Sequence, residues 1–302
     1  MQPKTFFDMD FGAAWKSYDA MDITLPPDDP ITSKVLRTAA KNHTLHIGSS
    51  GWTRKEFVGT LYPNNIKDTS MLTTYSELYD CVELNATHYK IYSPAEVRKW
   101  LEKVKNNEFI FCPKFPQSIS HDSTLLNATE ETKAFLDGIK AFGKQLGPVF
   151  LQLSEHFSPA RKLNLYKYLE QLPEEIDFFV ELRHHEWFSN RFERKEFFNT
   201  LREMAIGVVM TDTPGRRDVL HMGLTTPQLF LRFVTKGDHI NDIRRLEEWL
   251  PKLEEWKAAG LEETWFFLHV HEGEYEAAFY KEVRSLFGLE PREAQESQLS
   301  LF

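Results

Sequence analysis

Short apolar or β-branched segments recur eight times along the chain, and longer amphipathic segments separate them. The apolar segments lie at residues 45–49, 80–85, 109–114, 149–153, 178–182, 207–212, 229–233 and 265–270. Amphipathic segments such as 93–105, 161–171 and 244–259 have the apolar spacing of a helix. Regular alternation of strand and helix is typical of a parallel sheet, and eight units favour closure into a barrel. The sequence therefore predicts an α/β fold, a single (β/α)8 TIM barrel.

An open, doubly wound sheet is the alternative arrangement, but no glycine-rich phosphate turn of the Rossmann type follows the first strand. The 302 residues are 41% hydrophobic, which is enough for one large core. We expect the barrel to span residues 45–288. Residues 1–44 form an N-terminal extension that packs on it, and residues 289–302 form a short flexible tail.

Composition excludes several classes of protein. No apolar run reaches the roughly 20 residues of a membrane helix, and the first ten residues do not resemble a signal peptide. Cys81 and Cys112 lack the spacing of a metal or redox motif and are expected to be reduced core thiols. The net charge of −9 argues against a surface built for duplex DNA, although it leaves room for a local basic site. We expect a cytoplasmic protein with no membrane partner.

Polar residues occupy alternate positions in the predicted strands. Val82 and Leu84 share one face of their strand, and Glu83 and Asn85 share the other. Apolar residues suit the helical layer, so the polar set is expected at the barrel mouth, where the carboxyl ends of the strands meet. This predicted mouth set is His46, Ser50, Glu83, Asn85, Lys114, Gln152, Glu181, Arg183, Asp212, Arg232, His269 and His271. A buried salt-bridge plug without function is the alternative, although apolar residues would fill a barrel at a lower desolvation cost.

The loops that follow the strands contain further cationic and aromatic residues. These residues are Trp52, His88, Tyr89, His121, His184, His185, Trp187, Arg216, Arg217 and Lys236. An excess of cations favours an anionic ligand such as phosphate, and aromatic rings beside arginines suit stacking on a base or sugar. Arg216 and Arg217 could equally form an ordinary solvated turn.

Five motifs carry a resemblance to a known family. Residues 47–52 (IGSSGW), 82–89 (VELNATHY), 111–114 (FCPK), 147–153 (GPVFLQL) and 180–187 (VELRHHEW) resemble the YecE-like proteins, a bacterial and archaeal TIM-barrel domain of unknown function. The resemblance spans about residues 45–287 and implies the barrel fold, but no activity. The family's characteristic positions here are Gly51, Trp52, Glu83, Asn85, Tyr89, Lys114, His121, Gln152, Glu181, Arg183, Trp187, Asp212 and Arg232. The chain departs from the pattern at Ser154, where proline is usual, and in the last strand, where an Asn pair is common.

These residues define a candidate site with two sets of roles. The expected catalytic residues are Glu83, Glu181, Lys114 and Asp212, with a glutamate as general base and the cations stabilising a developing anion. The expected substrate-binding residues are Trp52, Asn85, Tyr89, His121, Gln152, Arg183, Trp187 and Arg232. The site would bind an anion in a phosphodiester hydrolase associated with DNA repair, or at a nucleic-acid end. The alternatives are a metal-free hydrolase or lyase on a small phosphorylated or sugar substrate, and a non-catalytic nucleotide-binding or adaptor protein.

The mouth also contains two candidate metal ligands. His269 and His271 lie two residues apart, on one face of a strand, and could bind a metal together with Glu181 or Asp212. Three permanent cations in the same mouth would repel a metal ion. We therefore expect no metal and no cofactor.

The last five residues, QLSLF, resemble the peptide by which bacterial DNA polymerases and repair proteins bind the sliding clamp. In such peptides apolar side chains, here Leu299, Leu301 and Phe302, enter an apolar pocket, and the glutamine, here Gln298, makes polar contacts. Residues 290–297 are polar and charge-rich, as in a flexible tether. The alternative is that the apolar residues fold back onto a groove of the barrel.

Overall fold

Eight parallel strands form the sheet in the computed structural model, which describes residues 22–37, 42–123, 125–237, 239–270 and 273–294. The strands are β1 (Thr44–Ser50), β2 (Cys81–Leu84), β3 (Ile110–Pro113), β4 (Val149–Gln152), β5 (Phe178–Glu181), β6 (Gly207–Asp212), β7 (Gln228–Val234) and β8 (Glu263–His269). Their order is β3-β2-β1-β8-β7-β6-β5-β4. The predicted alternation of strand and helix is confirmed, and with it the TIM-barrel fold.

The sheet closes between β3 and β4 through a short seam. Seven neighbouring strand pairs are joined by parallel ladders, whereas two isolated bridges, Phe111 with Leu146 and Lys114 with Phe150, join β3 to β4. The amide of Phe115 donates to the carbonyl of Phe150 at 3.0 Å, and the amide of Gly147 donates to that of Phe111 at 2.9 Å. These bonds convert the sheet into a barrel.

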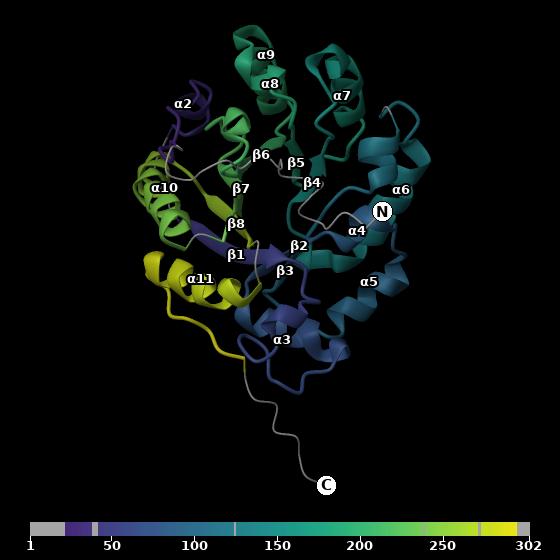
Figure 1. Ribbon diagram of the computed structural model, residues 1–302. Helices are drawn as coiled ribbons and strands as arrows, with labels where there is room; N and C mark the ends of the chain where they lie inside the picture. Colours follow the sequence, from purple (N-terminus) through teal and green to yellow (C-terminus); the bar gives the residue numbers. More distant parts are fainter. Residues whose placement is uncertain (1–21, 38–41, 124, 238, 271–272, 295–302) are drawn as a thin grey trace, which may run out of the picture.

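Helices surround the barrel on its outside, as Figure 1 shows. The helices longer than one turn are α3 (Met71–Leu78), α5 (Pro94–Leu101), α6 (Thr129–Ile139), α7 (Lys162–Leu169), α9 (Arg191–Glu203), α10 (His239–Ala259) and α11 (Gly273–Leu286). The short helices are α2 (Thr32–Val35), α4 (Ala86–Tyr89) and α8 (Glu186–Ser189). Two helices begin at polar caps that satisfy free backbone amides: Ser93 forms a capping box with Glu96 before α5, and Asn190 caps α9.

The interior of the barrel is a separate apolar core. It consists of Cys81, Cys112, Phe150, Phe179, Val209, Phe230, Trp265 and Phe267, which come from β2 to β8. Gly48 of β1 faces Cys81, and a Cβ atom at Gly48 would lie 2.6 Å from the carbonyl oxygen of Cys81. Only glycine therefore fits where these two strands approach. The outward-facing apolar residues form a second, larger cluster with the helices.

The chain preceding the barrel packs on its outer side. Thr32 donates to the carbonyl of Met222 at 3.0 Å, and Asp29 accepts a hydrogen bond from Arg194 of α9 at 2.6 Å. Asp28 accepts from the indole of Trp256 in α10 at 2.9 Å. Residues 22–37 thus contact both α9 and α10, and Figure 1 shows α2 beside α10. Among the described residues, no helix is long and apolar enough to cross a membrane.

A candidate site at the carboxyl ends of the strands

A layer of polar side chains lies directly above the apolar core of the barrel. Each member stands two residues after a core residue, so both point inward. The layer contains Glu83, Lys114, Gln152, Glu181, Thr211, Arg232 and His269, each at most 5% exposed. We call these seven residues, together with Asn85 and Arg183 one further step along β2 and β5, the mouth cluster.

Arg232 of β7 joins the two glutamates of the mouth cluster. Its Nε and Nη2 atoms donate to Oε2 and Oε1 of Glu83 at 2.9 and 3.0 Å. Its Nη1 atom donates to Oε2 of Glu181 at 2.8 Å. All three side chains are at most 2% exposed. One guanidinium therefore holds two carboxylates that come from opposite parts of the sheet.

Glu181 has further donors on the other side. Its Oε1 atom accepts hydrogen bonds from the Nε atom of Arg183 and from the hydroxyl of Thr211, both at 2.9 Å. The Oε1 atom of Gln152 lies 3.3 Å from Nη2 of Arg183 and 3.5 Å from Nη1 of Arg232. Gln152 thus links the two guanidinium groups. Both carboxylate oxygens of Glu181 and the amide oxygen of Gln152 face hydrogen-bond donors.

Glu83 is bound by two more side chains. Nε2 of His269 lies 2.9 Å from its Oε2 atom, and Nδ2 of Asn85 donates to its Oε1 atom at 2.9 Å. Because an ionised carboxylate only accepts, Nε2 of His269 carries the proton. Burial lowers the pKa of His269 against the opposing effect of Glu83, and the nearby Arg232 lowers it further. A neutral imidazole that donates to Glu83 is the form this arrangement favours.

Both glutamates are held in the ionised form. Burial opposes ionisation of Glu83, but Arg232 and His269 outweigh it and hold the pKa of this carboxyl well below its ordinary value. Burial likewise opposes ionisation of Glu181, and the charges of Arg183, Arg232 and Lys114 outweigh it and lower its pKa. Neither carboxyl is therefore a proton donor near neutral pH.

A pocket of about 520 Å³ opens beside the mouth cluster, over the loops that follow β4, β5 and β6. Arg183 is the residue of the mouth cluster that reaches its wall. The other residues of the wall are Glu155, His156, Ser158, His184, His185, Arg216 and Asp218. The rings of His184 and His185 are stacked with centroids 4.9 Å apart. We call this the basic pocket.

Arg216 connects the basic pocket to the backbone of β5. Its Nη2 atom donates to the carbonyl of Arg183 at 2.6 Å, and its Nε and Nη2 atoms each lie 2.9 Å from a carboxylate oxygen of Asp218. The partly exposed guanidinium is thus held in place by a backbone carbonyl and by one carboxylate at the surface.

Asp212 does not lie in the mouth, contrary to the expectation from its position in the strand. Its Oδ1 atom accepts from Arg245 of α10 at 2.8 Å, and its Oδ2 atom accepts from the indole of Trp249 at 2.8 Å. Arg217 also contacts Oδ1, at 2.5 Å. Val209 points into the core, so Thr211, two residues later, points inward and Asp212 points toward the helices.

The two tryptophans expected to bind substrate also pack in the helical layer. Trp187 is fully buried and donates to the carbonyl of Phe157 at 2.7 Å. Trp52 packs edge-on against Trp100 of α5, with ring centroids 5.6 Å apart. These contacts give both indoles a structural role on the outside of the barrel.

Tyr89 and His121 lie together at the ends of β2 and β3. The ring of His88 is 5.3 Å from that of Tyr89 and 5.2 Å from that of His121. Tyr89 is 61% exposed, and His121 is bound to the hydroxyl of Ser120 at 2.8 Å.

Twelve catalytic and substrate-binding residues were expected in the site. The mouth cluster contains seven of them: Glu83, Asn85, Lys114, Gln152, Glu181, Arg183 and Arg232.

The described residues include no group of three or more His, Cys, Asp or Glu side chains with the geometry of a metal site. His269 instead contacts Glu83 beside the guanidinium of Arg232. His271, the other weak metal candidate, lies outside the described residues. The donor set around His269 is therefore that of an ion-pair network.

Thr211 and Arg245 were not predicted from the sequence. Thr211 could have been found by counting two residues from an inward-facing core position of β6. Arg245 lies in a helix rich in charged residues, and nothing in its local sequence distinguishes it from its exposed neighbours, yet it is fully buried against Asp212 and Asp242.

A further buried carboxyl, Glu276, lies outside the barrel wall. Glu276 of α11 accepts from the hydroxyl of Ser49 at 2.7 Å and from Nη2 of Arg54 at 2.7 Å. Burial raises its pKa to about 7, against the opposing effects of Arg54 and Ser49. Unlike Glu181, which binds both Arg183 and Arg232, this carboxyl has a single guanidinium partner.

An eight-stranded α/β barrel with a buried ion-pair network at the carboxyl ends of its strands is the class of protein that these features define. The family model described as protein of unknown function DUF72 matches residues 46–300. The chain belongs to this family.

Relatives and solved structures agree with that assignment. The chain is 27% identical over 243 residues to the UPF0759 protein YecE of Escherichia coli strain K12, covering 74% of this chain and 86% of YecE. A crystal structure of a DUF72 family protein from Thermotoga maritima has a TM-score of 0.64 at 22% identity, covering 82% of this chain and 100% of that one. One from Enterococcus faecalis has a TM-score of 0.66 at 16% identity, covering 85% and 100%. These structures support the barrel fold.

Proposed function

We propose that this barrel binds a phosphate-bearing ligand, a nucleotide or a nucleic-acid end, in the basic pocket. The observation that carries the proposal is the position of Arg183, whose guanidinium contacts Glu181 in the mouth cluster and also lines the pocket. The buried carboxylate of Glu181 fixes the orientation of this guanidinium at the pocket wall. Such preorganisation favours an anion such as phosphate, two oxygens of which can accept parallel hydrogen bonds from the planar guanidinium.

The rest of the pocket wall supports an anionic ligand. Five of its side chains are arginine or histidine, and two are carboxylates. Arg216 is partly exposed, and its carboxylate partner Asp218 is an exposed side chain that a ligand can displace at a low desolvation cost. The stacked rings of His184 and His185 offer a flat surface for a base or sugar.

The state of the glutamates favours binding over acid catalysis. Glycoside hydrolysis needs one protonated carboxyl as general acid, and such a group has a raised pKa. Both Glu83 and Glu181 have lowered pKa values, and Arg232 bridges them. We therefore assign to these carboxylates the role of orienting Arg183 and Arg232, and we rank a sugar hydrolase below a phosphate-binding protein.

The test is calorimetric titration with pyrophosphate, and with a short single-stranded oligonucleotide that either carries a 5′-phosphate or lacks it. We expect both phosphate-bearing probes to bind and the unphosphorylated oligonucleotide to bind at least tenfold more weakly. Replacing Arg216 by Gln should weaken pyrophosphate binding at least tenfold, because one charge-assisted interaction contributes roughly 1.5–3 kcal/mol.

Arg98→Gln is the matched control, since Arg98 is an exposed arginine of α5 far along the chain from the pocket. It should bind pyrophosphate as the unmodified protein does. His184→Ala is a second variant that leaves the mouth cluster intact. Equal affinities of the Arg216, His184 and Arg98 variants would show that the basic pocket is not the binding site. Release of inorganic phosphate or a nucleotide from the oligonucleotide would add hydrolysis to the proposal.

A further inference from the structure

We propose that residues 298–302 bind a bacterial sliding clamp and thereby tether the barrel to it. The proposal concerns a partner and not the mouth, so it does not rest on the proposed function. The five residues lie outside the described residues, and their sequence, Gln-Leu-Ser-Leu-Phe, supplies the chemistry. Three apolar side chains at the chain end suit an apolar cleft, and the amide of Gln298 suits a polar rim.

The segment that precedes this peptide is attached to the barrel by two contacts. After α11 the chain runs along the barrel, and the Nε atom of Arg284 donates to the carbonyl of Glu290 at 2.7 Å. Nη2 of Arg292 lies 2.6 Å from Oδ1 of Asp80. Residues 289–294 are therefore held against the barrel, which corrects the expectation of a flexible tether that begins at residue 290. The linker before the peptide is at most residues 295–297.

A short linker limits where the peptide can reach. Eight extended residues after Ala294 span at most about 29 Å, and three span about 11 Å. Asp80, which holds Arg292, directly precedes β2, so the anchor lies at the amino-terminal end of the strands. The mouth cluster and the basic pocket lie at the opposite end. A partner bound to the tail would thus leave the mouth accessible.

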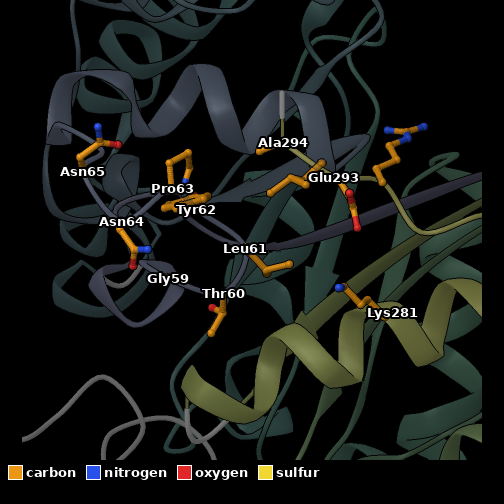
Figure 2. Close-up of a pocket in the computed structure, with 12 residues that line it drawn as sticks. Gly59, Thr60, Leu61, Tyr62, Pro63, Asn64, Asn65, Lys281, Glu293 and Ala294 are labelled. Carbon is orange, nitrogen blue, oxygen red and sulfur yellow. The ribbon is translucent and has the colours of Figure 1, made fainter. Parts of the chain in front are cut away.

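The pocket nearest to the anchor does not suit the apolar peptide. It has a volume of about 820 Å³ and lies between the loop after β1, α11 and the segment that ends at Ala294, as Figure 2 shows. Asn64, Asn65, Lys281 and Glu293 lie around it (Figure 2). The apolar residues of its wall, such as Leu61, are already buried by the barrel.

A second cavity is the place where the apolar end of the chain could instead fold back onto the barrel. About 550 Å³ in volume, it is lined by Leu45, Leu250, Leu253 and Phe287, among others. Leu289 lies at its edge and already supplies an apolar side chain from the chain itself. If residues 299–302 folded back into this cavity, their removal would destabilise the barrel, which the experiment can measure.

The experiment measures binding of the full chain to a purified bacterial sliding clamp, by surface plasmon resonance up to about 100 μM. We expect saturable binding, weakened at least tenfold by Phe302→Ala. Ser300→Ala is the matched control, since Ser300 is the one residue of the five without an apolar or amide side chain, and it should bind within twofold of the unmodified chain. A synthetic peptide of residues 293–302 should compete.

Two results would overturn the proposal. One is no binding at about 100 μM, and the other is binding that Phe302→Ala leaves unchanged. A lowered melting temperature of the free Phe302→Ala protein, together with no clamp binding, would assign the tail to the apolar cavity instead. Pyrophosphate titration of the same variant separates the two proposals, because the anchor and the basic pocket lie at opposite ends of the barrel.

Discussion

Arg232 and Glu83 form a two-point ion pair in the centre of the barrel, with donor–acceptor distances of 2.9 and 3.0 Å, although 149 positions separate them in the chain. The same guanidinium also binds Glu181. Because both glutamates are buried, the energy of each depends on a cation that it shares with the other. We therefore expect mutations within the mouth cluster to have non-additive effects.

Replacing Arg232 by Met should lower the free energy of unfolding by about 3–5 kcal/mol, because it leaves two buried carboxylates without their shared cation. Urea unfolding measures the loss. Arg232→Lys should recover only part of it, because one ammonium cannot reproduce three fixed N–H contacts. A loss below about 1 kcal/mol in the Met variant would mean that the ion-pair network adds little to stability.

Acid should destabilise the barrel through Glu83 and Glu181. Both pKa values are lowered in the folded protein, so the stability that these groups contribute is present above the unfolded pKa and is lost as the pH falls through the folded values. We expect the free energy of unfolding to fall by at least about 2 kcal/mol between pH 5 and pH 3. Glu83→Gln should show a shallower fall over the same range, and an equally steep fall would exclude Glu83 as a contributor.

Glu276 should have the opposite pH dependence. Its folded pKa is raised to about 7, so its contribution is fully present below the unfolded pKa and is lost as the pH rises toward 7. The loss should amount to about 3 kcal/mol between pH 4.5 and pH 8. Glu276→Gln keeps the shape of the side chain but cannot ionise. Its stability relative to the unmodified protein should therefore rise across this range, and a constant difference would contradict the raised pKa.

Asp212→Asn should reduce stability and leave ligand binding intact. The carboxylate neutralises the buried Arg245 and accepts the indole N–H of Trp249 on the helical side of β6. Its loss should cost about 3–5 kcal/mol, measured by urea unfolding. Pyrophosphate affinity of the folded variant should stay within twofold of that of the unmodified protein. A larger loss of affinity would return Asp212 to the binding site.

The sequence was sufficient to predict the barrel and most of the mouth cluster. Eight apolar segments between amphipathic ones define the fold, and alternation within β2 and β5 places Glu83 and Glu181 inward. The same rule gives the wrong face for Asp212 if its polarity is taken to mean that it points inward. Val209 faces the core, so Thr211 points inward and Asp212 points toward the helices. Alternation gives two sets of side chains, but only the register of neighbouring strands shows which set is inside.

Other features depend on contacts that local sequence cannot reveal. Trp187 and Trp52 belong to family motifs near the mouth, yet their rings pack against Phe157 and Trp100 on the outside of the barrel. The division of charge is also a long-range property. The sequence shows that the mouth cluster contains three arginines or lysines and two glutamates. It does not show that each glutamate is neutralised by a partner within the cluster.

The seam between β3 and β4 has a consequence for motion. Two isolated bridges hold it, whereas a continuous parallel ladder of two or more residue pairs joins every other neighbouring pair, so we expect the sheet to separate most readily there. Lys114 belongs both to this seam and to the mouth cluster. Brief parting of the two strands would carry one positive charge away from Glu181 while Arg232 stays in place. The seam with the fewest strand bridges therefore passes through the charged centre of the barrel.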